Sequence, residues 1–116
     1  MGKLSTHILD TVHGGPAANV AFELVAMDPV PKLLISARTN ADGRTDEPLL
    51  KDADVKRGRY RLVFHIGDYF RARGLPLPDP AFLDVVNIDF GIAEDGGSYH
   101  VPLVCSPWTF STYRGS

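Results

Sequence analysis

The chain has 116 residues, of which 44% are hydrophobic and 22% are charged, and its formal net charge is -2 at pH 7. This length fits one domain over residues 1–116 and excludes a two-domain cofactor enzyme, while the balanced charge argues against nucleic acid or an anionic membrane as a partner. The single cysteine, Cys105, excludes an internal disulfide and a cysteine-based zinc site. Because the longest apolar run extends only from Leu24 to Met27, we expect a cytoplasmic protein without a membrane span or a signal peptide.

Alternation of apolar and polar residues, which is typical of strands with one buried face, recurs along the chain. In chain order, strands are expected at residues 4–10, 19–27, 32–38, 60–66, 86–92, 99–105 and 108–113. The four long strands carry these apolar sets on one face: Val20, Phe22, Leu24, Ala26; Tyr60, Leu62, Phe64, Ile66; Val86, Ile88, Phe90, Ile92; and Tyr99, Val101, Leu103, Cys105. Clusters of Gly, Pro, Asn and Asp between them favour turns. Seven or eight short strands joined by turns predict an all-β antiparallel sandwich.

One segment has a different pattern. Asp68 is a suitable N-cap for a run over residues 69–73, and this run is followed by Gly74 and then Pro76, which are typical of the end of a helix. The sequence therefore predicts one helix of one or two turns.

The four histidines are the first candidates for chemistry, because a neutral imidazole is the side chain best suited to take a proton near pH 7. His7 lies in the first expected strand, and His100 lies on the face of its strand opposite the apolar set. His13 sits in a glycine-containing turn and His65 shares a strand face with two arginines, which favours a structural or exposed role for both. Taken alone, His7 and His100 are also more typical of surface or hydrogen-bonded sheet residues than of catalysts.

No motif for a metal or a cofactor is present in the sequence. No two histidines stand at a spacing typical of a ligand pair, and Cys105 is five residues from His100, which places the two side chains on opposite faces of one strand. The same parity argues against a Cys-His catalytic pair. The sequence therefore argues against a zinc site.

Arg44 directly follows the turn formed by Asn40, Ala41, Asp42 and Gly43, a position from which its guanidinium can reach an anionic oxygen. From the residues alone, a solvated loop arginine is the more ordinary interpretation. The chain ends in a polar segment, residues 111–116, which directly follows a strand-like stretch; a frayed terminus is the ordinary expectation for such a segment.

Taken together, four segments resemble the 5-hydroxyisourate hydrolases, the transthyretin-related enzymes of purine breakdown. The segments are Leu4-Ser5-Thr6-His7-Ile8-Leu9-Asp10, Thr39-Asn40-Ala41-Asp42-Gly43-Arg44, Tyr99-His100-Val101-Pro102-Leu103 and the terminal Tyr113-Arg114-Gly115-Ser116. They resemble, in order, the family's opening strand, its arginine-bearing turn, its second histidine strand and the tetrapeptide that separates these enzymes from the transthyretin hormone carriers. Four matches in the same order are far more specific than any one of them.

This resemblance implies two four-stranded sheets with one short helix, assembled as a homotetramer, a dimer of dimers with active sites at the mouths of a central channel. It implies hydrolysis of the small molecule 5-hydroxyisourate to 2-oxo-4-hydroxy-4-carboxy-5-ureidoimidazoline, without a cofactor. His7 and His100 would share the reacting water and Arg44 would hold the substrate. The Ser116 hydroxyl or the terminal carboxylate would orient one imidazole, and Tyr113, Arg114 and Gly115 would also contact substrate.

Two other readings come from different classes of protein. A transthyretin-like carrier would bind a small ligand in the central channel without catalysis, but it needs neither the two histidines nor the turn arginine. An adhesion or structural sandwich is less favoured, because the sequence has no signal peptide, no disulfide and no N-glycosylation motif.

Overall fold

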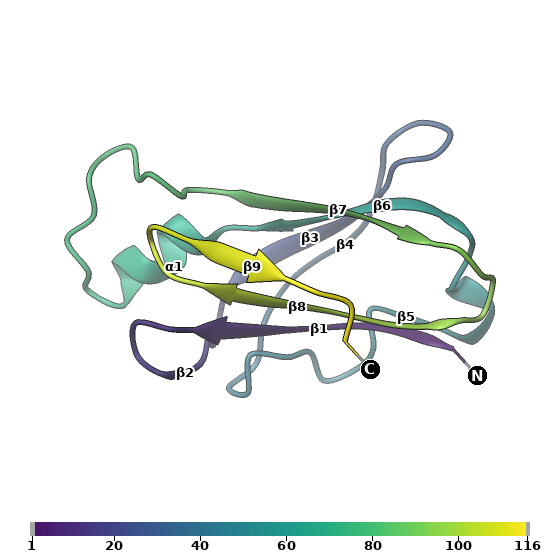
Figure 1. Cartoon of the computed structure of the whole chain (residues 1–116), viewed down its shortest axis with the longest axis horizontal. Coiled ribbons are helices and arrows are strands. Elements are labelled where there is room, and N and C mark those ends of the chain that lie inside the picture. The colour runs from purple at the N-terminus through teal and green to yellow at the C-terminus, as the bar shows by residue number, and fades with distance from the viewer. Residues whose placement is uncertain (1, 116) are drawn as a thin grey trace.

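The computed structural model describes residues 2–115, in which two β-sheets face each other across an apolar core (Figure 1). The first sheet has the order β2 (Gly15–Pro16), β1 (Lys3–Asp10), β8 (Ser98–Cys105) and β9 (Phe110–Thr112), and β5 (Leu50–Lys51) also pairs with β1. The second sheet has the order β4 (Lys32–Arg38), β3 (Ala21–Ala26), β6 (Gly58–Phe64) and β7 (Val86–Ile92). The prediction of an all-β sandwich is confirmed.

The expected strand directions need a correction. β1 and β8 pair in parallel over their whole lengths, from Lys3 opposite Ser98 to Asp10 opposite Cys105. The first sheet also has five strands rather than four, because of the two-residue β5. An alternating pattern reveals which face of a strand is buried and is the same for parallel and antiparallel pairing, so it could not give the direction. The parallel pair matters because it sets which outward side chains of β1 and β8 lie side by side.

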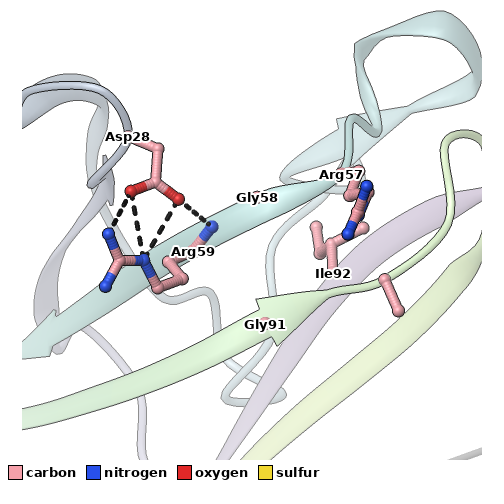
Figure 2. Close-up of a pocket in the computed structure, with 7 residues that line it drawn as sticks. Asp28, Arg57, Gly58, Arg59, Gly91 and Ile92 are labelled. Carbon is pink, nitrogen blue, oxygen red and sulfur yellow. Dashed lines mark hydrogen bonds and ion pairs between the residues drawn. The ribbon is translucent and has the colours of Figure 1, made fainter.

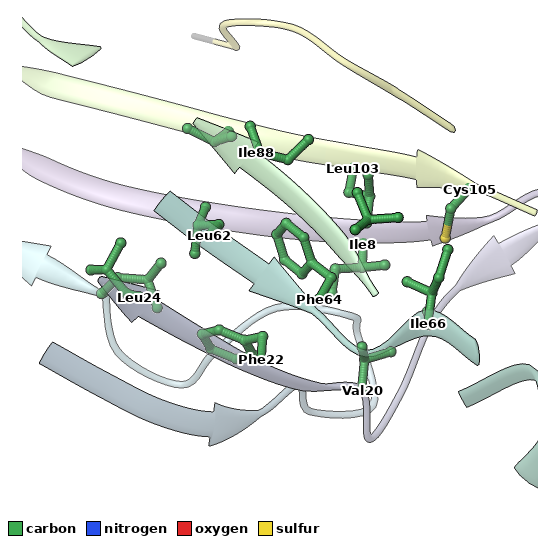
Figure 3. Close-up of a cluster of buried hydrophobic side chains, with 14 of the residues drawn as sticks. Ile8, Val20, Phe22, Leu24, Leu62, Phe64, Ile66, Ile88, Leu103 and Cys105 are labelled. Atoms are coloured by element: carbon green, nitrogen blue, oxygen red, sulfur yellow. The ribbon is translucent and has the colours of Figure 1, made fainter. Parts of the chain in front are cut away.

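The core fills the space between the sheets (Figure 3). Side chains with 0% exposure come from both sheets: Phe22, Leu24, Leu62 and Phe64 from one, and Leu4, Ile8 and Leu103 from the other. Fully burying a side chain of this size contributes ~1.5–3 kcal/mol. All four predicted apolar sets face this core. Because side chains alternate along a strand, the intervening residues, His7 and His100 among them, point outward.

The short helix is present, but its predicted beginning is wrong. α1 spans Ile66–Ala72 with His65 at the N-cap position, while Asp68 lies inside the first turn. Packing explains the earlier start, since Ile66, Tyr69 and Phe70 are buried and recur at helical spacing on the side that faces the core. The end of the helix is as predicted, because Gly74 has φ of 86° and its N–H donates to the Arg71 carbonyl at 2.9 Å.

Two further features complete the described chain. A one-turn 3₁₀ helix, η1 (Asp52–Asp54), follows β5 and leads toward the second sheet. Within residues 2–115, no helix has the length and the apolar content that crossing a membrane would require.

Candidate active site

The outer face of the parallel pair β1 and β8 carries both of the predicted catalytic histidines. The register places Ser5 opposite His100 and His7 opposite Pro102, so the two histidines are diagonal neighbours on adjacent strands. Diagonal neighbours in a sheet are about 7–8 Å apart. Both imidazoles are half-buried. Their separation leaves room for a water molecule or a small substrate between two groups that can each take a proton.

The turn that carries Arg44 is attached to β1 beside His7. The Ile8 N–H donates to the Gly43 carbonyl at 2.8 Å, which joins the turn to the strand. The Asn40 side-chain oxygen closes the turn by accepting from the N–H groups of Asp42 at 2.9 Å and Arg44 at 3.2 Å. Gly43 has φ of 72°, a conformation that glycine adopts without strain. The turn therefore presents Arg44 to the outer face of the sheet from a fixed backbone.

The electrostatics of the two histidines show that Arg44 lies within reach of both. Burial, followed by the positive charge of Arg44, lowers the pKa of His7 below its ordinary value of 6.5, although a backbone hydrogen bond with Asp42 opposes this shift. Burial lowers the pKa of His100 in the same way, with Arg44 next in effect and His7 after it. Both imidazoles are therefore neutral at pH 7 and able to accept a proton. The structure brings together His7, Arg44 and His100, as the resemblance implied.

The chain end continues the sheet beyond β9. Leu103 lies opposite Thr112, and the same register returns at the bridge between His100 and Gly115, where the Gly115 N–H donates to the His100 carbonyl at 2.8 Å. This register sets Tyr113 level with Pro102, in the row that also contains His7. Tyr113 and Gly115 therefore border the two histidines from the side opposite β1.

Arg114 does not join this group. Its place in the register is level with Val101, which faces the core, and its guanidinium lies 4.4 Å from the centre of the Tyr99 ring. It also donates to the Ser98 carbonyl at 3.3 Å. Strand parity thus directs Arg114 away from the histidines, and its contacts hold the chain end against β8. Ser116 lies outside the described residues.

The remaining histidines and the cysteine are held in other contacts. His13 Nδ1 lies 2.6 Å from the buried Asp10 carboxylate, and His65 Nε2 lies 2.8 Å from the Glu23 carboxylate. Burial raises the pKa of the Cys105 thiol to about 12, so it remains protonated and unreactive. His13 and His65 therefore each have a carboxylate partner, whereas His7 and His100 lie near Arg44.

A groove of about 230 Å³ adjoins the candidate site and is lined by Lys3, Ser5, Thr6, Arg44, Thr45, Asp46, Glu47 and Pro48. A larger hollow lies over β6 and β7 of the other sheet, where Asp28 and Arg59 hold each other through several hydrogen bonds (Figure 2). No histidine among the described residues lines this hollow, whereas the groove is lined by Arg44, which lies within electrostatic reach of His7 and His100, and this makes the groove the better candidate.

Sequence reasoning missed two residues of the site. The Ser5 hydroxyl oxygen lies 2.8 Å from His100 Nδ1, and Lys3 acts on the same imidazole through its charge. Both face outward on β1, but their relation to His100 depends on the parallel register. A signal was available in the alternation of Lys3, Ser5 and His7 on one face of the first strand.

Comparison with known proteins decides the family. The model of the HIUase/Transthyretin family matches residues 4–115. The chain belongs to this family. Among its relatives in the HIUase/Transthyretin family, a 5-hydroxyisourate hydrolase of Ralstonia nicotianae is 50% identical over 117 residues, covering 100% of both chains.

Three solved structures from the comparison share the fold. An (S)-allantoin synthase superposes with a TM-score of 0.94 at 40% identity, covering 99% of this chain and 44% of that one, so this chain spans less than half of the synthase. A Klebsiella pneumoniae 5-hydroxyisourate hydrolase gives a TM-score of 0.82 at 36% identity over 100% of both chains. A transthyretin from Sparus aurata gives 0.84 at 26% identity, covering 99% of this chain and 97% of that one.

Proposed function

We propose that this chain hydrolyses 5-hydroxyisourate to 2-oxo-4-hydroxy-4-carboxy-5-ureidoimidazoline, a step in the breakdown of purines. The observation that carries the proposal is the convergence of two neutral imidazoles with one arginine on the outer face of β1 and β8. The full-length identity of 50% with a 5-hydroxyisourate hydrolase supports the same reaction. The chain acts as a hydrolase that opens a cyclic amide.

In the proposed mechanism, the imidazoles of His7 and His100 hold one water molecule between them, and one imidazole takes its proton as the water oxygen bonds to C6 of the substrate. The bond between N1 and C6 then breaks, and the proton passes to N1 as the ring opens. General-base assistance of this kind is worth ~10²–10⁴-fold in rate. The low pKa of each imidazole keeps it in the unprotonated form that the step requires.

Arg44 orients the electron-rich, weakly acidic ring and stabilises the negative charge that develops on the carbonyl oxygen during attack. We propose that Tyr113 and Gly115 border the bound ring. For Arg114, a direct contact with substrate is less favoured than a supporting role, because its guanidinium packs on Tyr99. The hydroxyl or carboxylate of Ser116 remains our proposed group for orienting one imidazole.

A transthyretin-like carrier is the alternative function, and the transthyretin fold neighbour is the observation that favours it. A direct assay separates the two: the protein is added to freshly prepared 5-hydroxyisourate, and the decay of its ultraviolet absorbance is compared with the spontaneous rate. We expect a large acceleration. A decay rate equal to that of the buffer control, with the protein folded, would exclude the hydrolase and leave the carrier.

We also propose that the chain assembles as a homotetramer and acts in the cytoplasm. Exposed aromatic side chains near the edge of the first sheet support assembly, since Trp108 is 58% exposed and Phe110 is 40% exposed. A free, buried thiol is suited to a reducing compartment. Light scattering at micromolar concentration should give close to four times 12.7 kDa, and a monomer mass would refute the assembly.

A further inference from the structure

The ring of His100 has two close neighbours, one at Nδ1 and one at Cδ2. The Ser5 hydroxyl oxygen lies 2.8 Å from Nδ1. Gly115 lies close to the ring edge that carries Cδ2. A Cβ atom added at Gly115 would stand only 2.5 Å from Cδ2 of His100. With these two edges occupied, Nε2 is the nitrogen that remains available to a water molecule or a substrate.

A nitrogen that accepts a proton must present a lone pair, so the reacting form of His100 has its proton on Nδ1 and not on Nε2. In a neutral histidine, the hydrogen bond made by one ring nitrogen decides which tautomer is present. The Ser5 hydroxyl can accept the Nδ1 proton or donate to an unprotonated Nδ1, so this contact by itself allows both tautomers. A backbone hydrogen bond with Ser5 raises the pKa of His100, so the ring donates a proton in that contact, and a protonated ring nitrogen on the Ser5 side is favoured.

From this geometry we infer that Ser5 is a positioning residue that holds His100 in the tautomer with a proton on Nδ1, so that Nε2 is the general base of the hydrolysis. The inference rests on the proposed function for its catalytic consequence, and it adds the choice of base that the histidine pair alone leaves open. Gly115 has a complementary role, since its missing side chain leaves space for the oriented ring.

Other charged groups near the ring do not supply this orientation. Arg44, His7 and Lys3 face His100 from the turn and from β1, and all of them disfavour protonation of its imidazole through their charge. Charge alone acts on the ring as a whole and does not choose between its nitrogens. Ser5 contacts Nδ1 directly, so it is the group that can distinguish the two ring nitrogens.

The test compares three variants with the parent protein. Ser5→Ala removes the hydroxyl, Ser5→Thr keeps it, and Ser36→Ala removes a hydroxyl from the exposed strand β4 of the other sheet as a matched control. Nitrogen-15 NMR of histidine-labelled protein reports which ring nitrogen of His100 carries the proton. Steady-state kinetics with 5-hydroxyisourate give kcat and KM separately.

We expect the parent, Ser5→Thr and Ser36→Ala to show the proton on Nδ1, and Ser5→Ala to show a shift of the proton towards Nε2. We also expect kcat of Ser5→Ala to fall about 10- to 100-fold, the loss that follows removal of a hydrogen-bond partner from a metal-bound histidine, with a smaller change in KM. A parent protein with the proton on Nε2 would overturn the inference even if Ser5→Ala failed to fold. An unchanged tautomer in folded Ser5→Ala would overturn it as well.

Failure of the proposed function gives a different result. In that case the parent protein would show the Nδ1 tautomer and its dependence on Ser5, but no acceleration of 5-hydroxyisourate decay.

Discussion

Replacing Gly43 by alanine tests whether the attachment of the arginine turn to β1 sets the activity. Gly43 has φ of 72°, and a Cβ atom there would stand 2.5 Å from the Ile8 carbonyl oxygen. That atom belongs to the backbone of β1, next to His7, so it cannot move aside as a flexible side chain would. The Gly43→Ala variant must therefore displace the turn, and Arg44 with it.

The expected loss of stability has two parts. An alanine in the left-handed conformation costs about 1–2 kcal/mol relative to glycine. Displacing the turn also breaks the hydrogen bond from the Ile8 N–H to the Gly43 carbonyl, which is 2.8 Å long; an intramolecular bond of this kind is worth about 0.5–1.5 kcal/mol. We expect a total destabilisation of about 2–3 kcal/mol and a fall in kcat/KM of about 10²-fold, the loss typical of a 1 Å misplacement of a positioning group.

Gly14→Ala is the matched control. Gly14 has φ of 75°, nearly the same as Gly43, but a Cβ atom there meets nothing within 4 Å. This variant should lose only the conformational part of the stability and keep its activity. Urea unfolding at equal protein concentration and the absorbance assay measure both quantities. If Gly43→Ala and Gly14→Ala behave alike in both measurements, the idea that the turn is held rigidly on β1 is wrong.

Two further predictions concern the reacting groups themselves. His7→Asn and His100→Asn should each lower kcat by at least ~10²-fold and leave the unfolding midpoint nearly unchanged. His13→Asn is the control and should keep its activity. An equal loss of kcat in all three variants would refute the separation of the histidines by strand face. Arg44→Lys should lower kcat/KM markedly although it keeps the charge, because an ammonium group cannot form a planar two-point contact with the substrate. Full activity of this variant in the same assay would show that Arg44 acts only through its charge.

Much of the fold was predictable because its strands bury one face. Apolar sets such as Val20 to Ala26 and Tyr99 to Cys105 fixed which side chains point inward, and all of them face the core. The beginning of α1 was mispredicted because Asp68 has the chemistry of a cap, whereas the burial of Ile66 decides where the helix starts. Local propensity was outweighed by tertiary packing.

For the site, residue types were predictable but neighbour relations were not. The outward direction of His100 follows from strand parity, yet its contact with Ser5 follows from a parallel register between residues 95 positions apart. No local pattern encodes that register. The prediction that Arg44 lies near His7 and His100 came from the resemblance to a family. The position of Arg44 depends on the attachment of its turn to β1. Arg114 shows the limit of such transfer, since parity turns its side chain away from the histidines.

The position of Arg44 beside both histidines links substrate binding to proton transfer. Its positive charge is the second cause, after burial, of the lowered pKa of His7 and of His100. An electron-rich substrate held by the guanidinium offsets that charge, so the pKa of the base should rise on binding. Activity requires the unprotonated base and is therefore lost as pH falls through this pKa.

The acid limb of kcat, which reports the substrate complex, should lie at a higher pH than that of kcat/KM, which reports the free enzyme. NMR titration of the Arg44→Gln variant isolates the cause: the pKa of both histidines should increase relative to the parent protein. Unchanged values in this variant would show that burial alone keeps the two imidazoles neutral.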